Sequence, residues 1–241
     1  MRIAILNDVH GNIYALEKVI ADLQTQSIDN VVFLGDSSFL GLYPQECFDQ
    51  IQALNPIINI KGNTDANVED LDQFHPTNDF EQILLEMCVY MDRNMNSKSK
   101  DILFKLKISE KEKFGDTDII FCHGSPYSYK DQLTEENIDK FKEQISEENV
   151  KSIICAHTHQ PAEFYINQTI IRNFGAIGYS FNGDIRAHYG IVEIVNERKM
   201  SFITREVEYS IEKYKSEIKE QNPPFKEMLL YSLENGRPKP Y

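Results

Sequence analysis

The sequence predicts an α/β fold built on a largely parallel sheet, and two patterns carry this prediction. Short apolar runs rich in β-branched residues recur along the chain, and segments with apolar residues three or four positions apart lie between them. This alternation indicates right-handed βαβ units, in which helices join parallel strands. The 241 residues can bury a substantial core, and they contain no repeat or linker, so a single domain over residues 1–241 is expected.

The first third of the chain shows the alternation most clearly. Strands are expected at 2–6, 31–34 and 57–60. Apolar residues at Leu16, Val19, Ile20 and Leu23 mark one face of the first helix, and Asn12 is its expected N-cap. Pro44 suits the first turn of the second helix, because proline needs no backbone donor there.

The rest of the chain is less regular. Apolar stripes over 80–91 and, more weakly, 102–106 predict a helical insertion over 66–118. Strands are expected again at 119–122 and 153–155, with a helix between them. Further short runs at 163–166, 169–172, 190–195 and 201–207 lack long intervening helices and are expected to be antiparallel strands. Two helices follow at the end of the chain.

The composition argues against several classes of function. Asp and Glu total 38 against 25 Lys and Arg, and the net charge of −13 opposes tight binding to nucleic acid. No apolar run approaches the ~20 residues of a membrane span, and the first residues do not follow a signal-peptide pattern. The four cysteines lie in apolar segments without C-x-x-C spacing, as expected for buried thiols in a reducing compartment. We therefore expect a cytoplasmic protein with no membrane partner.

Side chains that bind metals follow five of the expected strands. They are Asp8 and His10, Asp36, Asn63, His123, and His157 with His159. Ligands of open α/β sheets bind at the carboxyl ends of the strands, so these seven side chains can converge. Each of the two i, i+2 pairs would point to one side in an extended chain. A single Asp or His at a strand end is commonly a cap or turn residue, but five in succession indicate a site.

The donor set indicates the kind of metal. Carboxylate, amide and imidazole groups without thiolate suit Mn, Fe, Zn or Ni. Seven ligands exceed the need of one catalytic ion and fit two ions that share a carboxylate. His75 and His188 lie outside the pattern and are assigned no role.

At these residues the sequence resembles the calcineurin-like metallophosphoesterase superfamily. The family pattern D-x-H, G-D, G-N, H and G-H-x-H stands here as Asp8-Val9-His10, Gly35-Asp36, Gly62-Asn63, His123 and Ala156-His157-Thr158-His159. The sequence is more closely similar to the small bacterial phosphoesterases. That similarity rests on Gly41, Pro44 and Glu46 after Asp36, on Asn173, Gly175 and Gly178, and on Asp184-Ile185-Arg186.

The resemblance implies a four-layer α-β-β-α sandwich, made of two mixed sheets flanked by helices. It also implies two metal ions. Asp8, His10, Asp36 and His159 would hold one ion, and Asp36, Asn63, His123 and His157 the other, so that Asp36 bridges them. The implied activity is attack of a metal-activated hydroxide on a phosphate ester. The 66–118 insertion lies between two ligand-bearing strands in the sequence, so we expect it near the site.

One departure from the family leaves the general acid open. Protein phosphatases of the family have G-N-H-E, where this chain has Gly62-Asn63-Thr64-Asp65. Asp65 and a water on a metal are candidates for the proton donor, and Asn63 could donate to a phosphate oxygen. Small phosphodiesters are therefore the favoured substrates. The alternatives are a phosphomonoesterase, a protein phosphatase, a dinucleotide polyphosphate hydrolase and a non-catalytic scaffold on the same fold. The oligomeric state is left open.

Overall fold

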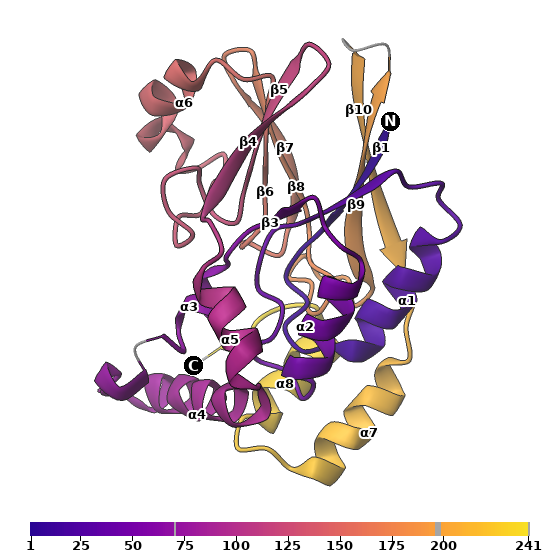
Figure 1. The fold of residues 1–241 in the computed structure, drawn as a ribbon. Helices are drawn as coiled ribbons and strands as arrows, with labels where there is room; N and C mark the ends of the chain where they lie inside the picture. Colours follow the sequence, from indigo (N-terminus) through magenta and orange to yellow (C-terminus); the bar gives the residue numbers. More distant parts are fainter. Residues whose placement is uncertain (70, 196–198, 241) are drawn as a thin grey trace.

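Two five-stranded mixed sheets face each other in the computed structural model, which describes residues 1–69, 71–195 and 199–240 (Figure 1). The first sheet has the order β10 (Lys199–Val207), β9 (Ala187–Val195), β1 (Arg2–Leu6), β2 (Asn30–Phe33) and β3 (Ile58–Asn59). The second has the order β4 (Ser109–Phe114), β5 (Thr117–Cys122), β6 (Ser152–Cys155), β8 (Thr169–Phe174) and β7 (Pro161–Ile166).

Helices cover the outer face of each sheet and complete four layers. Helices α1 (Ile13–Leu23) and α2 (Pro44–Ala53) share one apolar cluster with the first sheet. Helix α6 (Lys142–Glu148), preceded by the short 3-10 helix η2 (Ile138–Lys140), packs on the second sheet. A further cluster lies between the sheets themselves. The four-layer sandwich of two mixed sheets is therefore confirmed.

The remaining helices gather below the two sheets in the view of Figure 1. They are α3 (Asn63–Ala66), η1 (Leu71–Gln73), α4 (Asp79–Asn94), α5 (Ser97–Phe104), α7 (Ile211–Gln221) and α8 (Lys226–Asn235). Met87 and Met91 from α4 share a core with Tyr214 from α7 and Leu229 from α8. The apolar stripe over 80–91 thus finds its partner in the C-terminal helices.

Strand β1 shows how the sequence produces these layers. Ile3 and Ile5 pack in the cluster between the sheets, whereas Ala4 and Leu6 pack in the cluster under the helices. Both faces are buried, which explains why this strand reads as a continuous apolar run. The Asn12 side chain caps α1 by accepting a hydrogen bond from the Ala15 N–H at 3.2 Å, and Pro44 occupies the first turn of α2.

Several sequence expectations need correction. The 66–118 stretch contains α4 and α5, but strand β4 also lies in it, and its sequence SEKEKF escapes an apolar search because it is a half-exposed edge strand. Strand β3 has two residues, against four expected. Strand β8 was expected to be antiparallel to its neighbours. It is antiparallel to β7 but parallel to β6. Strands β9 and β10 are antiparallel as expected.

The structure also bears on the expectations about membrane spans and cysteines. None of the described helices is both long enough and apolar enough to cross a membrane. The four cysteines, Cys47, Cys88, Cys122 and Cys155, are buried and free.

Candidate metal centre

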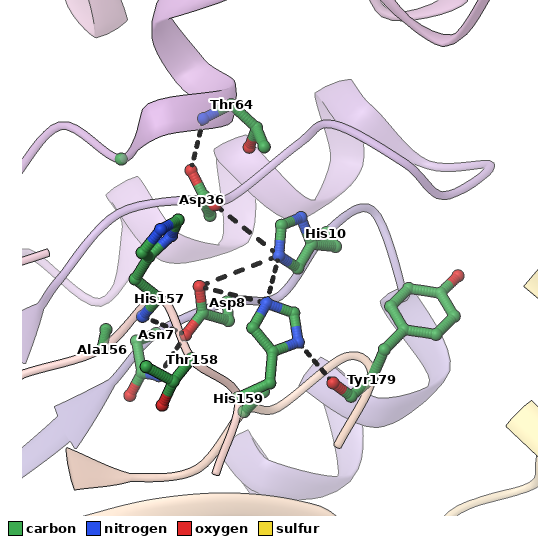
Figure 2. A network of polar contacts seen from close by, with 12 residues as sticks. Asn7, Asp8, His10, Asp36, Thr64, Ala156, His157, Thr158, His159 and Tyr179 are labelled. Atoms are coloured by element: carbon green, nitrogen blue, oxygen red, sulfur yellow. Dashed lines mark hydrogen bonds and ion pairs between the residues drawn. The ribbon is translucent and has the colours of Figure 1, made fainter. Parts of the chain in front are cut away.

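Loops from both sheets bring the ligand-type side chains together at the carboxyl ends of β1, β2, β3, β5 and β6 (Figure 2). The first sheet supplies Asp8, His10, Asp36 and Asn63, and the second supplies His123, His157 and His159. Main-chain hydrogen bonds hold the loops in place. The His10 N–H donates to the Asp36 carbonyl at 3.0 Å, and the His157 N–H donates to Asp8 Oδ2 at 3.2 Å.

One group of ligand atoms is formed by Asp8, His10 and His159. Asp8 Oδ1 lies 3.7 Å from His10 Nε2 and 3.6 Å from His159 Nε2. The two Nε2 atoms are 2.9 Å apart. All three side chains are buried, so any ion held here would have lost most of its water.

A second group is formed by Asp8, Asp36 and His123. His123 Nε2 lies 3.3 Å from Asp36 Oδ2, 3.9 Å from Asp8 Oδ1 and 2.9 Å from Asn63 Oδ1. Asp36 Oδ2 is also 3.7 Å from His10 Nε2. Asp36 therefore faces both groups, as a bridging carboxylate must, and Asp8 faces both groups as well.

His157 is placed differently from the other imidazoles. Its ring is partly exposed, and the ring centroid lies 5.1 Å from that of His123. It is not in either group of atoms within 4.8 Å of one another. His157 instead lies at the edge of the cluster, beside a hollow in the surface.

The histidines are oriented by backbone carbonyls that the sequence search could not find. His10 Nδ1 lies 3.0 Å from the Phe39 carbonyl, His123 Nδ1 lies 2.7 Å from the Leu34 carbonyl, and His159 Nδ1 contacts the Tyr179 carbonyl. A carbonyl can only accept, so each Nδ1 carries a proton and each Nε2 atom points inward, where it offers a lone pair whenever the ring is neutral. No sequence signal marks these partners, because every residue has a carbonyl.

This arrangement fits cations. Two Nε2 lone pairs from His10 and His159 face each other, and a carboxylate oxygen of Asp8 lies beside them. Asp8 Oδ1 is buried and has no hydrogen-bond partner among the described residues. Buried acceptors without donors are costly, and a positive ion between them would satisfy all of them.

The pKa values follow from burial and from the two carboxylates. Burial lowers the pKa of His10 and of His159 to about 4, so both rings are neutral at pH 7. Burial also opposes the charge on His123, but Asp36 and Asp8 raise its pKa to about 9. Burial would raise the pKa of Asp36, yet His123 and His10 hold it well below its usual value. The second group thus contains an ion pair between Asp36 and His123, whereas both imidazoles of the first group are neutral.

The ligand loops adopt a backbone conformation that side chains rarely take. The φ angles are 50° at Asp8, 51° at His10, 59° at Asp36, 69° at His157 and 58° at His159. All five lie in the left-handed region, where a Cβ is strained. The i, i+2 pairs therefore do not converge through an extended chain, as the sequence suggested, but through left-handed turns.

The two residues after Asn63 lie in α3, where this chain differs from the G-N-H-E motif. Asp65 is fully buried, and its carboxylate oxygens accept hydrogen bonds from backbone N–H groups. Burial and the charge of Asp36 raise the pKa of Asp65 to about 6. The Thr64 N–H donates to Asp36 Oδ1 at 2.9 Å, and the buried Thr64 hydroxyl has no partner among the described residues.

A hollow of about 560 Å³ opens beside His157 and Thr158. Its walls include the carboxylates Glu135, Glu136 and Glu163, and the ring of Phe181. Phe181 also stacks on the ligand-type His159, with 4.3 Å between ring centroids. None of the lining residues comes from the 66–118 stretch, although α5 in that stretch contacts α3, which begins at Asn63.

The family comparison agrees with this geometry. The family model described as the calcineurin-like phosphoesterase superfamily domain matches residues 1–197, a range that includes all seven ligand-type residues. The chain belongs to the calcineurin-like phosphoesterase superfamily.

Relatives of this phosphoesterase match it over nearly the whole chain. The uncharacterized protein MJ0912 of Methanocaldococcus jannaschii is 26% identical over an alignment of 247 positions, which covers 92% of this chain and 93% of that protein. A metallophosphoesterase from Sphaerobacter thermophilus has 24% identity and a TM-score of 0.77, covering 98% of this chain and 99% of the other. The hypothetical protein PH1004 from Pyrococcus horikoshii OT3 has 20% identity and a TM-score of 0.82, covering 99% of each chain. These two structures share the phosphoesterase fold.

The two histidines without an assigned role belong to neither of the two ligand groups of this phosphoesterase domain. His75 is exposed, in a segment that precedes α4. His188 is buried with Asp184 and Glu206 nearby, in a group that could in principle hold a metal. However, the Arg186 guanidinium already contacts both carboxylates, with N–O distances of 2.5 and 2.6 Å. The guanidinium of Arg186 therefore already supplies the positive charge beside these carboxylates.

Proposed function

We propose that the chain is a cytoplasmic, dinuclear metal-dependent phosphoesterase that hydrolyses small phosphate esters and favours phosphodiesters. The observation that carries this proposal is the inward aim of three buried Nε2 atoms onto the carboxylates of Asp8 and Asp36. A scaffold on this fold would have no reason to keep the costly set of facing acceptors formed by Asp8, His10 and His159.

The residues present would hold two ions in distinct ways. Asp8, His10 and His159 form one set of donors, and Asp8, Asp36 and His123 form the other. Asp36 Oδ2 also lies 3.7 Å from His10 Nε2, so Asp36 would be shared by both ions as well. Oxygen and imidazole donors suit Mn, Fe, Zn or Ni. Bound divalent ions supply an activated water and neutralise the charge that develops at phosphorus.

The chain itself contributes orientation and one further donor. Asn63 Oδ1 faces His123 Nε2 at 2.9 Å, so the Asn63 amide nitrogen is left to donate to a phosphate oxygen. His157, at the edge of the cluster, lies between the ligand groups and the hollow. We infer that the phosphate sits at the ligand groups and the rest of the substrate extends into the hollow.

The preference for diesters rests on the lack of a side chain suited to protonate a leaving group. Thr64 stands where protein phosphatases of the family have histidine, and the Asp65 carboxylate already accepts backbone N–H groups. An alkoxide of high pKa leaves slowly without a general acid, which typically contributes ~10²–10⁴ in rate. A diester with an acidic leaving group needs this help least.

The size and charge of the hollow support a small substrate that is not a polyanion. A volume of about 560 Å³ accommodates a nucleotide-sized group. The carboxylates of Glu135, Glu136 and Glu163 in its wall, with a chain charge of −13, oppose a strand of phosphates. We therefore propose no tight binding to nucleic acid. Submicromolar affinity for an oligonucleotide at ~0.15 M salt would instead favour a nuclease.

The test compares a diester and a monoester of the same phenol, with the metal-loaded protein. We expect the higher kcat/KM for the diester. His159→Gln should abolish hydrolysis, and the matched variant His75→Gln, at an exposed position, should not change it. A higher kcat/KM for the monoester would make the protein a phosphomonoesterase. No hydrolysis of either ester with two ions bound would make it a scaffold.

A further inference from the structure

Two carboxylates link the ligand loops that follow β2 and β3, each through the backbone of the other loop. Asp36 Oδ1 accepts a hydrogen bond from the Thr64 N–H at 2.9 Å. In return, Asp65 Oδ2 accepts from the Asp36 N–H at 2.9 Å, and Asp65 Oδ1 lies 3.3 Å from the Ser37 nitrogen. Asp65 Oδ2 also accepts from the Gly62 N–H at 2.9 Å. We name this set of four hydrogen bonds the carboxylate clasp.

The two loops joined by the clasp are packed too closely to shift relative to each other. A Cβ built on Gly62 would lie 1.9 Å from Asp36 Oδ1 and 2.5 Å from the Asp36 nitrogen, so only glycine allows the two loops to approach this closely. Asp65 itself has no exposed surface. Asp36 sits at φ 59°, a strained conformation that needs support from its surroundings.

We propose that Asp65 is a positioning residue, which fixes the Asp36 and Asn63 side chains relative to each other and does not donate a proton to the substrate. Its carboxylate reaches the ligands only through the backbone: Asp36 N–H on one side, and Gly62 N–H, next to Asn63, on the other. Both Asp65 oxygens already accept backbone N–H groups, and the side chain has no exposed surface from which to reach a leaving group, so it is needed as an acceptor.

The chemistry of the side chain sets what each substitution would do. Asparagine at position 65 keeps one acceptor oxygen but turns an NH2 group toward an N–H of the other loop, where two donors would face each other. Glutamate keeps the charge and the acceptors but is one methylene longer, so it would move the Asp36 loop away from Gly62. If Asp65 donated a proton, Asp65→Glu would keep much of its function, whereas the four hydrogen bonds of the clasp require a side chain of fixed length.

The first measurement is metal affinity, which does not depend on the proposed activity. Partners of metal ligands commonly contribute 10–100-fold to affinity, so metal-free Asp65→Asn should bind Mn or Zn about 10–100-fold more weakly by titration calorimetry. Asp65→Glu should also bind more weakly. Backbone amide exchange at Asp36, Ser37 and Gly62 should be faster in both variants.

A matched control lies on the surface. Glu81 near the start of α4 accepts from the Thr77 N–H at 2.7 Å, so it also ties a helix start to the preceding chain, but none of its hydrogen-bond partners in the described part of the chain is a ligand-type residue. Glu81→Gln should leave metal affinity unchanged, with faster exchange at Thr77 alone. Equal loss of metal affinity in Glu81→Gln would show a general effect on stability and would overturn the proposal.

The second measurement rests on the proposed phosphoesterase function and uses aryl methyl phosphates with leaving groups of increasing pKa. A positioning role predicts that Asp65→Asn lowers kcat by the same factor for every ester. Parent metal affinity combined with a loss that grows with leaving-group pKa would make Asp65 the general acid. If Asp65→Asn binds metal and hydrolyses every ester like the parent protein, Asp65 has neither role. If the parent protein hydrolyses none of the esters, the proposed function fails, and the affinity and exchange measurements still decide on the clasp.

Discussion

Asp36→Asn is the change expected to damage the centre most. Asp36 Oδ2 lies 3.3 Å from His123 Nε2 and 3.7 Å from His10 Nε2, so its charge acts on both ligand groups. A unit charge ~4 Å from another is worth ~4 kcal/mol at an effective dielectric constant of ~20, or a factor of about 10³ in affinity. The amide would also present an NH2 group either to the Nε2 atoms or to the Thr64 N–H.

We therefore expect Asp36→Asn to lose about 10³-fold in metal affinity and at least as much in kcat/KM on an aryl diester. Metal content after gel filtration and steady-state kinetics at saturating metal measure the two effects. Asp101→Asn in α5 is the control, since it removes the same charge at an exposed position. The pKa of His123, now about 9, should fall in metal-free Asp36→Asn, as seen by NMR. Two retained ions with activity close to the parent would refute the assignment of Asp36 as the shared ligand.

Four further predictions follow from the same geometry. Asp36 and Asp8 raise the pKa of His123 to about 9, so metal binding at pH 7 should release close to one proton from this ring. His10 and His159, whose pKa values are about 4, should release none. Calorimetry in two buffers should show that the proton release vanishes above pH 9 and in His123→Gln. Chelation should abolish activity and lower Tm, because free metal at 1,000 times its Kd stabilises the fold by about 4 kcal/mol. Mn should restore activity and Tm better than Mg. Full turnover in protein verified as metal-free would contradict the mechanism. His75→Ala and His188→Ala should each bind two ions like the parent, and loss of an ion from either would mean that the ligand set is wrong. Glu135→Gln with Glu136→Gln should raise kcat/KM for an ester bearing a second anionic group relative to its neutral counterpart, and an unchanged ratio would separate the hollow from substrate choice.

The parts of the fold that the sequence predicts well are those with a strong local pattern. Strand β1 and helix α1 follow from apolar periodicity and from the capping side chain of Asn12. Strand β4 was missed, because an edge strand with one exposed face needs few apolar residues. The two residues of β3 are fixed by pairing with β2, which no local pattern encodes.

The centre was predictable in its side chains and not in its backbone. Ligand residue types at the ends of successive strands are visible in the sequence. The left-handed turns at Asp8 and His10 are not, since non-glycine residues reach this conformation only when tertiary contacts impose it. Likewise, nothing in the sequence shows that the oxygens of Asp65 already have donors from a loop 28 or more positions away.

The position of the centre between two sheets has a consequence for the chain as a polymer. His10 and His159, whose Nε2 atoms face each other, are 149 positions apart in the sequence. An ion held by both would act as a reversible cross-link between the sheets. A permanent cross-link over a loop of ~100 residues restricts the unfolded chain by about 5 kcal/mol. Metal supply would then control how firmly the two halves of the molecule are tied together, much as redox conditions control a disulfide.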